Sequence, residues 1–231
     1  MIVSHEHKYV FIKTPKTAGT SLEIALSKYC GPDDIITPIS PRDEASRRAL
    51  GHARPQNYTI PRRRWSARDH VKWLAGKGPP AFFNHASASY MRRYLPGGVW
   101  EDYFTFCFER NPWDKAISRY YWDHREDPAP DLSAYIRDEL PHKRRGWDLY
   151  TIDGRVAVDR VYLFEELDEA VSDLSERFGF AQGLDLPRAK SGHRPGRAHY
   201  TALLDDGQRN AIAALFSEEI EAFGYTFSAE I

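Results

Sequence analysis

The sequence predicts an α/β protein with a single domain, in which helices flank a mainly parallel central sheet. Three short apolar segments alternate along the chain with amphipathic ones, as is typical of strands joined by helical crossovers. The chain has 231 residues, of which 42% are hydrophobic, so it is long enough to bury one sizeable core. We therefore expect one domain over residues 1–231.

The three expected strands are rich in β-branched and aromatic residues, and they are Tyr9–Ile12, Tyr103–Glu109 and Val161–Phe164. The second is dense enough in aromatic side chains to be buried on both faces. A loop of small residues follows the first strand, and Thr20 or Ser21 is the expected N-cap of a helix that continues to about Tyr29.

Helical patterns recur at residues 67–74, 85–95, 112–124, 165–178 and 205–223. The third of these begins at Pro112, a residue suited to the first turn of a helix. From about residue 38 to residue 80, prolines and arginines are interleaved with little periodicity. We expect an irregular, basic insertion there, with one short helix at 67–74.

The net charge of −1 favours neither nucleic acid nor an acidic membrane as a partner. Charge is nevertheless uneven, because residues 42–77 hold ten basic residues against three acidic ones. This stretch either attracts an anionic acceptor such as an acidic glycan or balances the acidic C-terminal half. No segment has the apolar length of a signal peptide or a membrane span, which predicts a cytoplasmic protein.

Cys30 and Cys107 are the two cysteines, and they lack the spacing of a zinc or redox motif. We expect both to be buried thiols. No constellation of residues with the spacing of metal ligands occurs, so no metal is predicted.

The loop from Lys13 to Ser21 joins the end of a strand to the start of a helix, where successive backbone N–H groups converge on an anion. Gly19 permits close backbone approach, and Lys16 adds a mobile positive charge. The loop therefore predicts a P-loop-like phosphate site, although a plain turn with an exposed lysine is the alternative. It is not a Walker A motif, because Lys16 precedes Gly19.

Arg110 follows the carboxyl end of an apolar strand, which is where open parallel sheets bind ligands. Ser118 lies about two turns into the next helix and would reach a phosphate held by Arg110. The structural alternative is that Arg110 pairs with Asp114 or Glu109.

Together these two elements resemble the carbohydrate branch of the sulfotransferases that use 3'-phosphoadenosine 5'-phosphosulfate (PAPS). The matching segments are Pro15-Lys-Thr-Ala-Gly-Thr-Ser21 and Arg110-Asn-Pro-Trp-Asp-Lys-Ala-Ile-Ser118. The segments 164–167 and 223–227 also look like landmarks of this family. The resemblance spans nearly the whole chain and is weakest between residues 35 and 80.

The resemblance implies that Lys16 contacts the phosphosulfate and stabilises charge on the leaving oxygen. The 5'-phosphate would be held by the loop residues Pro15, Lys16, Thr17, Ala18, Gly19, Thr20 and Ser21. Arg110 and Ser118 would bind the 3'-phosphate. Positioning and charge neutralisation by lysine and amides suffice for such transfer without a metal.

A histidine or glutamate between the two motifs is the general base in related enzymes. We select His85, whose imidazole would titrate near neutrality, with His52 as the second choice. Arg194 and Arg197 lie in a basic loop that either contacts the donor or is a solvated surface loop.

The expected acceptor is a hydroxyl group, with a saccharide favoured by the branch resembled, and the sequence gives no oligomeric state. Two other functions stay open. A nucleotide-dependent kinase would use the same loop, but the loop of this chain lacks a lysine at the Walker position. A non-catalytic protein that binds acidic glycans would have less reason to retain Lys16, Arg110 and Ser118 together.

Overall fold

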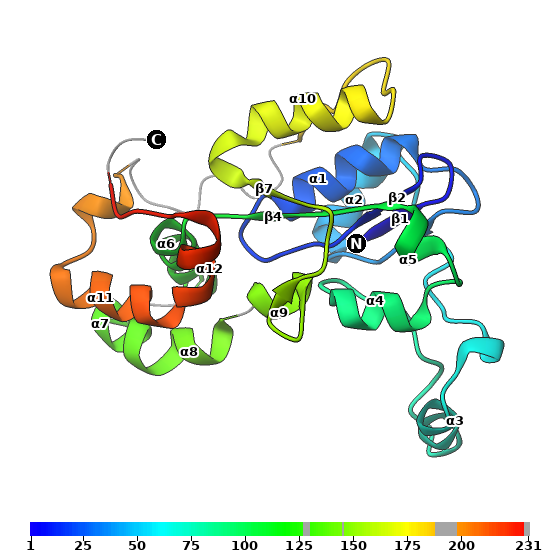
Figure 1. The fold of residues 1–231 in the computed structure, drawn as a ribbon, viewed down its shortest axis with the longest axis horizontal. Helices are drawn as coiled ribbons and strands as arrows, with labels where there is room; N and C mark the ends of the chain where they lie inside the picture. Colours follow the sequence, from blue (N-terminus) through cyan, green and yellow to red (C-terminus); the bar gives the residue numbers. More distant parts are fainter. Residues whose placement is uncertain (127–129, 145, 188–197, 229–231) are drawn as a thin grey trace.

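A five-stranded sheet forms the centre of the protein, in a computed structural model that describes residues 1–126, 130–144, 146–187 and 198–228 (Figure 1). In spatial order its strands are β3 (Ile35–Ile36), β1 (Ile2–Ser4), β2 (Tyr9–Phe11), β4 (Phe104–Glu109) and β7 (Arg160–Leu163). The three strands expected from the sequence thus lie side by side, each within one or two residues of its expected bounds.

The sheet is mixed, although its core is parallel. β2, β4 and β7 pair in parallel, whereas β1 is antiparallel to both β2 and β3. Two strands, β1 and β3, were not predicted from the sequence. β1 forms a tight hairpin with β2. A separate two-stranded sheet contains β5 (Thr151–Ile152) and β6 (Arg155–Val156).

The helices are α1 (Gly19–Leu26), α2 (Pro41–Ala49), α3 (Ala67–Leu74), α4 (Ala88–Tyr94), α5 (Val99–Asp102), α6 (Pro112–Asp123), α7 (Leu132–Ala134), α8 (Leu140–Lys143), α9 (Trp147–Tyr150), α10 (Leu167–Arg177), α11 (Asp206–Leu215) and α12 (Ser217–Phe223). The other helical segments are the 3-10 turns Ser27–Tyr29, Arg62–Arg64, Phe164–Glu166 and Tyr200–Ala202 and the π-helical segment Tyr135–Glu139. In Figure 1, α1 and α10 cover one face of the sheet, and α4 and α9 cover the other.

Alternation along the strands divides the core between these two faces. In β4, Phe106 and Phe108 pack with α1 and α10, whereas Cys107 between them packs with α4 and α9. A third apolar cluster joins α6 to the C-terminal helices. The fold class predicted from the sequence is therefore correct at the level of an α/β sheet flanked by helices.

Two helix starts differ from the expectation. α1 has no side-chain cap from Thr20 or Ser21, because both lie inside its first turn and Ala18 is the N-cap in a left-handed conformation. The helix expected from residue 85 begins only at Ala88, where the side chain of Ser87 accepts a hydrogen bond from the backbone N–H of Tyr90.

The single helix expected over residues 205–223 is divided at Phe216 into α11 and α12. The expected irregular stretch contains α3 as predicted, but also the unpredicted α2. Ser40 caps α2 by accepting a hydrogen bond from the backbone of Asp43, and Pro41 occupies its first turn.

Cys107 is buried as expected, whereas Cys30 is partly exposed. Burial raises the pKa of both thiols. Among the helices that the structure describes, none has the length and apolar character needed to cross a membrane.

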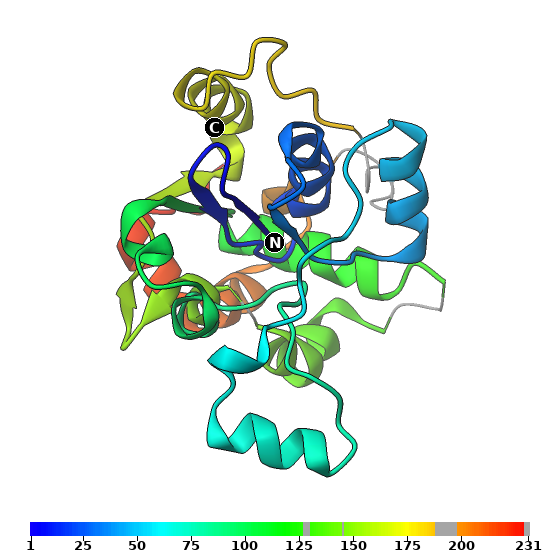
Figure 2. The same cartoon turned by 90° about the vertical axis from the view of Figure 1, so that its right-hand side faces the viewer.

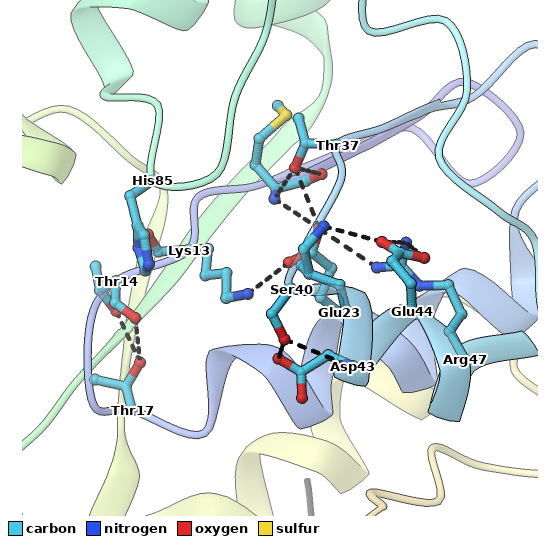
Figure 3. Close-up of polar contacts among 12 residues, drawn as sticks. Lys13, Thr14, Thr17, Glu23, Thr37, Ser40, Asp43, Glu44, Arg47 and His85 are labelled. Carbon is cyan, nitrogen blue, oxygen red and sulfur yellow. Dashed lines mark hydrogen bonds and ion pairs between the residues drawn. The ribbon is translucent and has the colours of Figure 1, made fainter. Parts of the chain in front are cut away.

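A buried ionic cluster around Glu23 of α1 connects the chain start, the first loop and α2 (Figure 3). The carboxylate of Glu23 is fully buried and lies 3.0 Å from the amino group of Met1, 2.9 Å from Nζ of Lys13 and 3.5 Å from Nη2 of Arg47. The hydroxyl of Thr37 donates a hydrogen bond of 3.2 Å to it. One carboxylate therefore joins three segments that are distant in sequence.

Burial alone would raise the pKa of Glu23, but the Met1 amino group, Lys13 and Arg47 lower it to about 2. Burial also lowers the pKa of the Met1 amino group to about 6. Above that pH, the positive charge facing Glu23 is therefore supplied chiefly by Lys13 and Arg47.

We predict that Glu23→Gln lowers the free energy of unfolding by about 3–5 kcal/mol, because it leaves buried cations without their carboxylate. Urea denaturation would measure the change. The matched control is Glu101→Gln, since Glu101 pairs with Arg92 at 4.0 Å while 59% exposed, and it should change stability by less than about 0.5 kcal/mol.

The depressed pKa of Glu23 also predicts a pH dependence in the wild type. Its stabilising contribution is present above pH 4.5 and is lost as the pH falls towards 2, where the folded protein takes up the proton. Glu23→Gln should show a weaker loss over this range. Identical acid profiles for the two proteins would contradict the assignment.

Candidate functional site

The loop between β2 and α1 has an unusual backbone. Lys16 and Ala18 have positive φ angles of 66° and 56°, in the left-handed region that side chains other than glycine rarely adopt. The hydroxyl of Thr14 donates to the carbonyl oxygen of Phe108 in β4, and Thr17 donates to the carbonyl of Thr14 at 3.2 Å. The loop is thus fastened to the neighbouring parallel strand.

Gly19 is required where the loop turns into α1. A Cβ at this position would lie 2.8 Å from Cγ of Lys13 and 3.2 Å from the carbonyl oxygen of Thr14. Lys13 has little freedom to move away, because its Nζ is held by Glu23. Gly19 is therefore needed for close packing within the chain itself, whereas the approach of a phosphate to it stays a prediction.

Arg110 reaches from the end of β4 to the loop. Its Nη1 donates to the carbonyl oxygen of Lys16 at 3.0 Å and to Oγ of Ser118 at 3.4 Å. Its Nε and Nη2 donate to Asp114 at 2.9 Å and 2.5 Å, and its guanidinium lies 4.2 Å from the ring centre of Phe164. The structure therefore brings the two predicted motifs together, and the structural alternative, the Arg110–Asp114 pair, is present as well.

The strand end that carries Arg110 is fixed by a second buried ionic cluster. Glu109 accepts from Nζ of Lys115 at 2.6 Å, from the hydroxyl of Tyr150 at 2.9 Å and from the backbone N–H of Arg110 at 2.8 Å. Glu219 is fully buried beside it, and burial raises the pKa of that carboxyl. This cluster orients the backbone from which Arg110 projects.

The ammonium of Lys16 lies 4.8 Å from the ring centre of Trp122 in α6. Beside it is a small depression whose lining includes the cations Lys16, Lys115, Arg119, Lys143 and Arg144. Each of the last four pairs with a carboxylate. The depression is therefore close to electrostatic balance and does not by itself select an anion.

His85 lies against the same loop (Figure 3). A carbonyl oxygen can only accept a hydrogen bond, so the 2.8 Å contact between Nδ1 of His85 and the carbonyl of Lys13 places the proton on Nδ1. The lone pair of Nε2 is then the proton acceptor. Burial, and secondarily the charge of Lys13, lower the pKa of His85 to about 4 rather than near neutrality as expected.

His52 contacts a different part of the fold, because its Nδ1 hydrogen bonds to the carbonyl of Ile24 in α1 at 2.8 Å. Arg194 and Arg197 lie outside the residues that the structure describes. Arg47 belongs to the basic stretch thought to attract an acceptor, but it is fully buried against Glu23 and Glu44 and is no part of a surface patch.

Three residues that shape the site were not predicted from the sequence, namely Lys13, Glu23 and Trp122. Glu23 carried a signal, because a lone carboxylate beside Leu22 and Ile24 in an apolar helix predicts a buried ionic partner. Asp114 was considered only as an alternative partner of Arg110.

Comparison with known proteins adds a relationship but no activity. No protein-family model matches the chain, and no solved structure matches it. A protein of Archaeoglobus fulgidus, described as an uncharacterized protein, is 31% identical over 93 residues, which is 38% of this chain and 78% of the archaeal one. The chain belongs to the same family as this archaeal protein. That relationship names no reaction.

We predict that the imidazole of His85 titrates with a midpoint near pH 4. Because folding holds this ring neutral, its contribution to stability is complete above the ordinary pKa of about 6.5 and is lost as the pH falls towards 4. NMR of the imidazole carbon-bound protons, assigned with His85→Gln, measures the midpoint. A midpoint at 6 or above would show that the ring is not held as described.

Proposed function

We propose that this protein is a sulfotransferase that transfers the sulfuryl group of PAPS to a hydroxyl group, with a saccharide as the acceptor, in the cytoplasm. One observation carries the proposal. Nη1 of Arg110 lies within hydrogen-bonding distance of both the Lys16 carbonyl and the Ser118 hydroxyl. Residues of the two motifs therefore meet at one place, as a donor with phosphates at both ends of its ribose requires.

The loop would act as a P-loop-like cradle for the 5'-phosphosulfate. Its left-handed residues, Lys16 and Ala18, turn the backbone sharply ahead of the N-terminus of α1, and such turns direct N–H groups towards an anion. Asp114 holds two nitrogens of Arg110 on one side. The third, Nη1, would exchange its contacts with Lys16 and Ser118 for the 3'-phosphate.

In the transfer step, the acceptor oxygen would attack sulfur in line with the bond to the bridging phosphate oxygen. That S–O bond breaks as the new one forms, and the acceptor proton passes to Nε2 of His85. The ammonium of Lys16 would neutralise charge on the departing adenosine 3',5'-bisphosphate. A pKa near 4 keeps His85 neutral across the physiological range, so Nε2 is able to accept the proton, although the imidazole is then a weaker base than one that titrates near neutrality.

A kinase that uses ATP is the competing function, because the same loop geometry suits any terminal phosphate. The position of Lys16 before Gly19 argues against it, since a Walker lysine follows the last glycine. Nucleotide preference therefore separates the two functions.

We predict that adenosine 3',5'-bisphosphate stabilises the protein in a thermal-shift assay more strongly than ATP with magnesium. Arg110→Ala should weaken bisphosphate binding about 10- to 100-fold, since a charge-assisted contact is lost, and should affect 5'-AMP much less. Calorimetry measures the affinity of wild type and variant for each of the two nucleotides. Arg177→Ala is the control, because Arg177 is 46% exposed on α10.

Equal losses for the two nucleotides would remove Arg110 from its assigned role. Stabilisation by ATP with magnesium and none by the bisphosphate would favour the kinase.

We predict different kinetic defects for Lys16 and His85. His85→Ala should lower turnover about 10²-fold or more and leave donor affinity nearly unchanged, because the base acts only on the acceptor proton. Lys16→Ala should lower turnover and also weaken donor binding. Initial rates and donor calorimetry measure the two effects, with His70→Ala on the exposed α3 as control.

Excess EDTA should leave turnover intact, since the mechanism uses no metal. Near-normal turnover in His85→Ala, with an unchanged acidic limb of the pH profile, would exclude His85 as the base.

A further inference from the structure

Residues 61–80 form an arm that projects from the domain and carries α3. At its base, the backbone N–H of Ile60 donates a hydrogen bond of 3.0 Å to the carbonyl of Pro80. On the domain side of this contact, Thr59 and Ala81 form a β-bridge. Figures 1 and 2 both show α3 extending away from the sheet and its covering helices. The arm is therefore a defined structural unit.

The inner side of the arm is held in place by polar contacts. Ser66 and Asp69 form a capping box at the start of α3, and the hydroxyl of Tyr94 donates to Asp69 at 2.8 Å. Arg64 donates to the carbonyl of Tyr94 at 3.0 Å. α3 is consequently fixed in one orientation relative to α4.

The outer side of α3 is apolar, which reverses the usual arrangement of a surface helix. Ala67, Val71 and Leu74 are spaced by four and three residues, so they share one face. Val71 is 65% exposed and Leu74 is 78% exposed, whereas the carboxylate-bearing Asp69 is buried. In most surface helices the apolar face packs on the core and the charges face water.

Cations accompany this apolar face, on α3 itself and in the segments before and after it. The exposed basic residues of the arm are Arg62, Arg63, Arg68, Lys72 and Lys77. The guanidinium of Arg62 lies 4.3 Å from the ring centre of Trp73, which is itself 40% exposed. The arm thus exposes aliphatic side chains, an aromatic ring and several positive charges together.

We infer that α3 docks on the surface of a membrane that contains anionic phospholipid, with Val71 and Leu74 inserted between the headgroups. Basic amphipathic helices bind such surfaces through apolar insertion and attraction to anionic lipids. Eight residues present too small a strip for the roughly 800 Å² per partner of a stable protein interface. A soluble anionic glycan would engage the cations but leave Val71 and Leu74 in water.

The test is co-sedimentation with vesicles of phosphatidylcholine alone or with about 30% phosphatidylserine, at low salt. The wild type should bind only the anionic vesicles. Val71→Ser with Leu74→Ser should weaken binding at least 10-fold. Arg68→Gln, Lys72→Gln and Lys77→Gln combined should weaken it on the order of 100-fold, from about fivefold per cation.

Two matched controls come from α2 and the residue after it, because Leu50 is 51% exposed and Arg48 is also exposed. Leu50→Ser and Arg48→Gln should bind vesicles like the wild type. All substituted positions lie on the surface, and circular dichroism checks that each variant is folded. Vesicle binding needs neither donor nor acceptor, so the result is independent of the proposed enzymatic activity.

Three results would overturn the inference. The first is absence of wild-type binding to the anionic vesicles. The second is equal binding by the wild type and both arm variants. The third combines two observations. A soluble sulfated polysaccharide binds tightly, and this binding is lost in the variant without the three cations but not in the variant without Val71 and Leu74. Vesicle binding is likewise unchanged when Val71 and Leu74 are replaced.

Discussion

The ion pair between Lys13 and Glu23 lies beneath the loop, and the geometry above depends on it. Glu23 holds the end of the Lys13 side chain, so the aliphatic part of Lys13 stays under Gly19 and sets how closely the loop approaches α1. The carbonyl of Lys13 in turn orients His85. Further along the loop, the carbonyl of Lys16 meets Arg110. A buried ion pair therefore positions the groups that we propose to bind the donor and the acceptor.

Local sequence patterns predicted the parts of the fold that depend on local physics. The apolar runs at β2, β4 and β7 indicated the parallel core, and Asn111-Pro112 marked the start of α6. The strand β1 was missed because Ile2–Ser4 is short and the polar residues of a hairpin follow it. α2 was missed because Asp43 and Arg47 are its buried residues. A helix that packs on the protein through charged side chains lacks the apolar periodicity from which helices are predicted.

The meeting of the two motifs was predictable to the same extent. Lys16, Arg110 and Ser118 were selected from motifs at strand ends, and the topology brings those strand ends together because β2 and β4 are parallel neighbours. The sequence could not show that Lys13 turns down to a buried carboxylate, or that burial lowers the pKa of His85. Nor could it show which face of α3 meets solvent, since periodicity identifies an apolar face but not its direction. These properties arise from contacts between distant segments.

The Glu23 cluster also bears on the order in which the protein folds. Its members come from the chain start, the first loop, α1 and α2, so the cluster closes only when these segments have docked and water has left. Ion pairs between these segments add little to the stability of a partly folded state, because the charges are still hydrated there. We therefore expect the cluster to form after the folding transition state and to slow unfolding rather than speed folding. In such a protein, the loop that would bind the donor takes its final shape after the transition state, and its ionic support raises the barrier to opening.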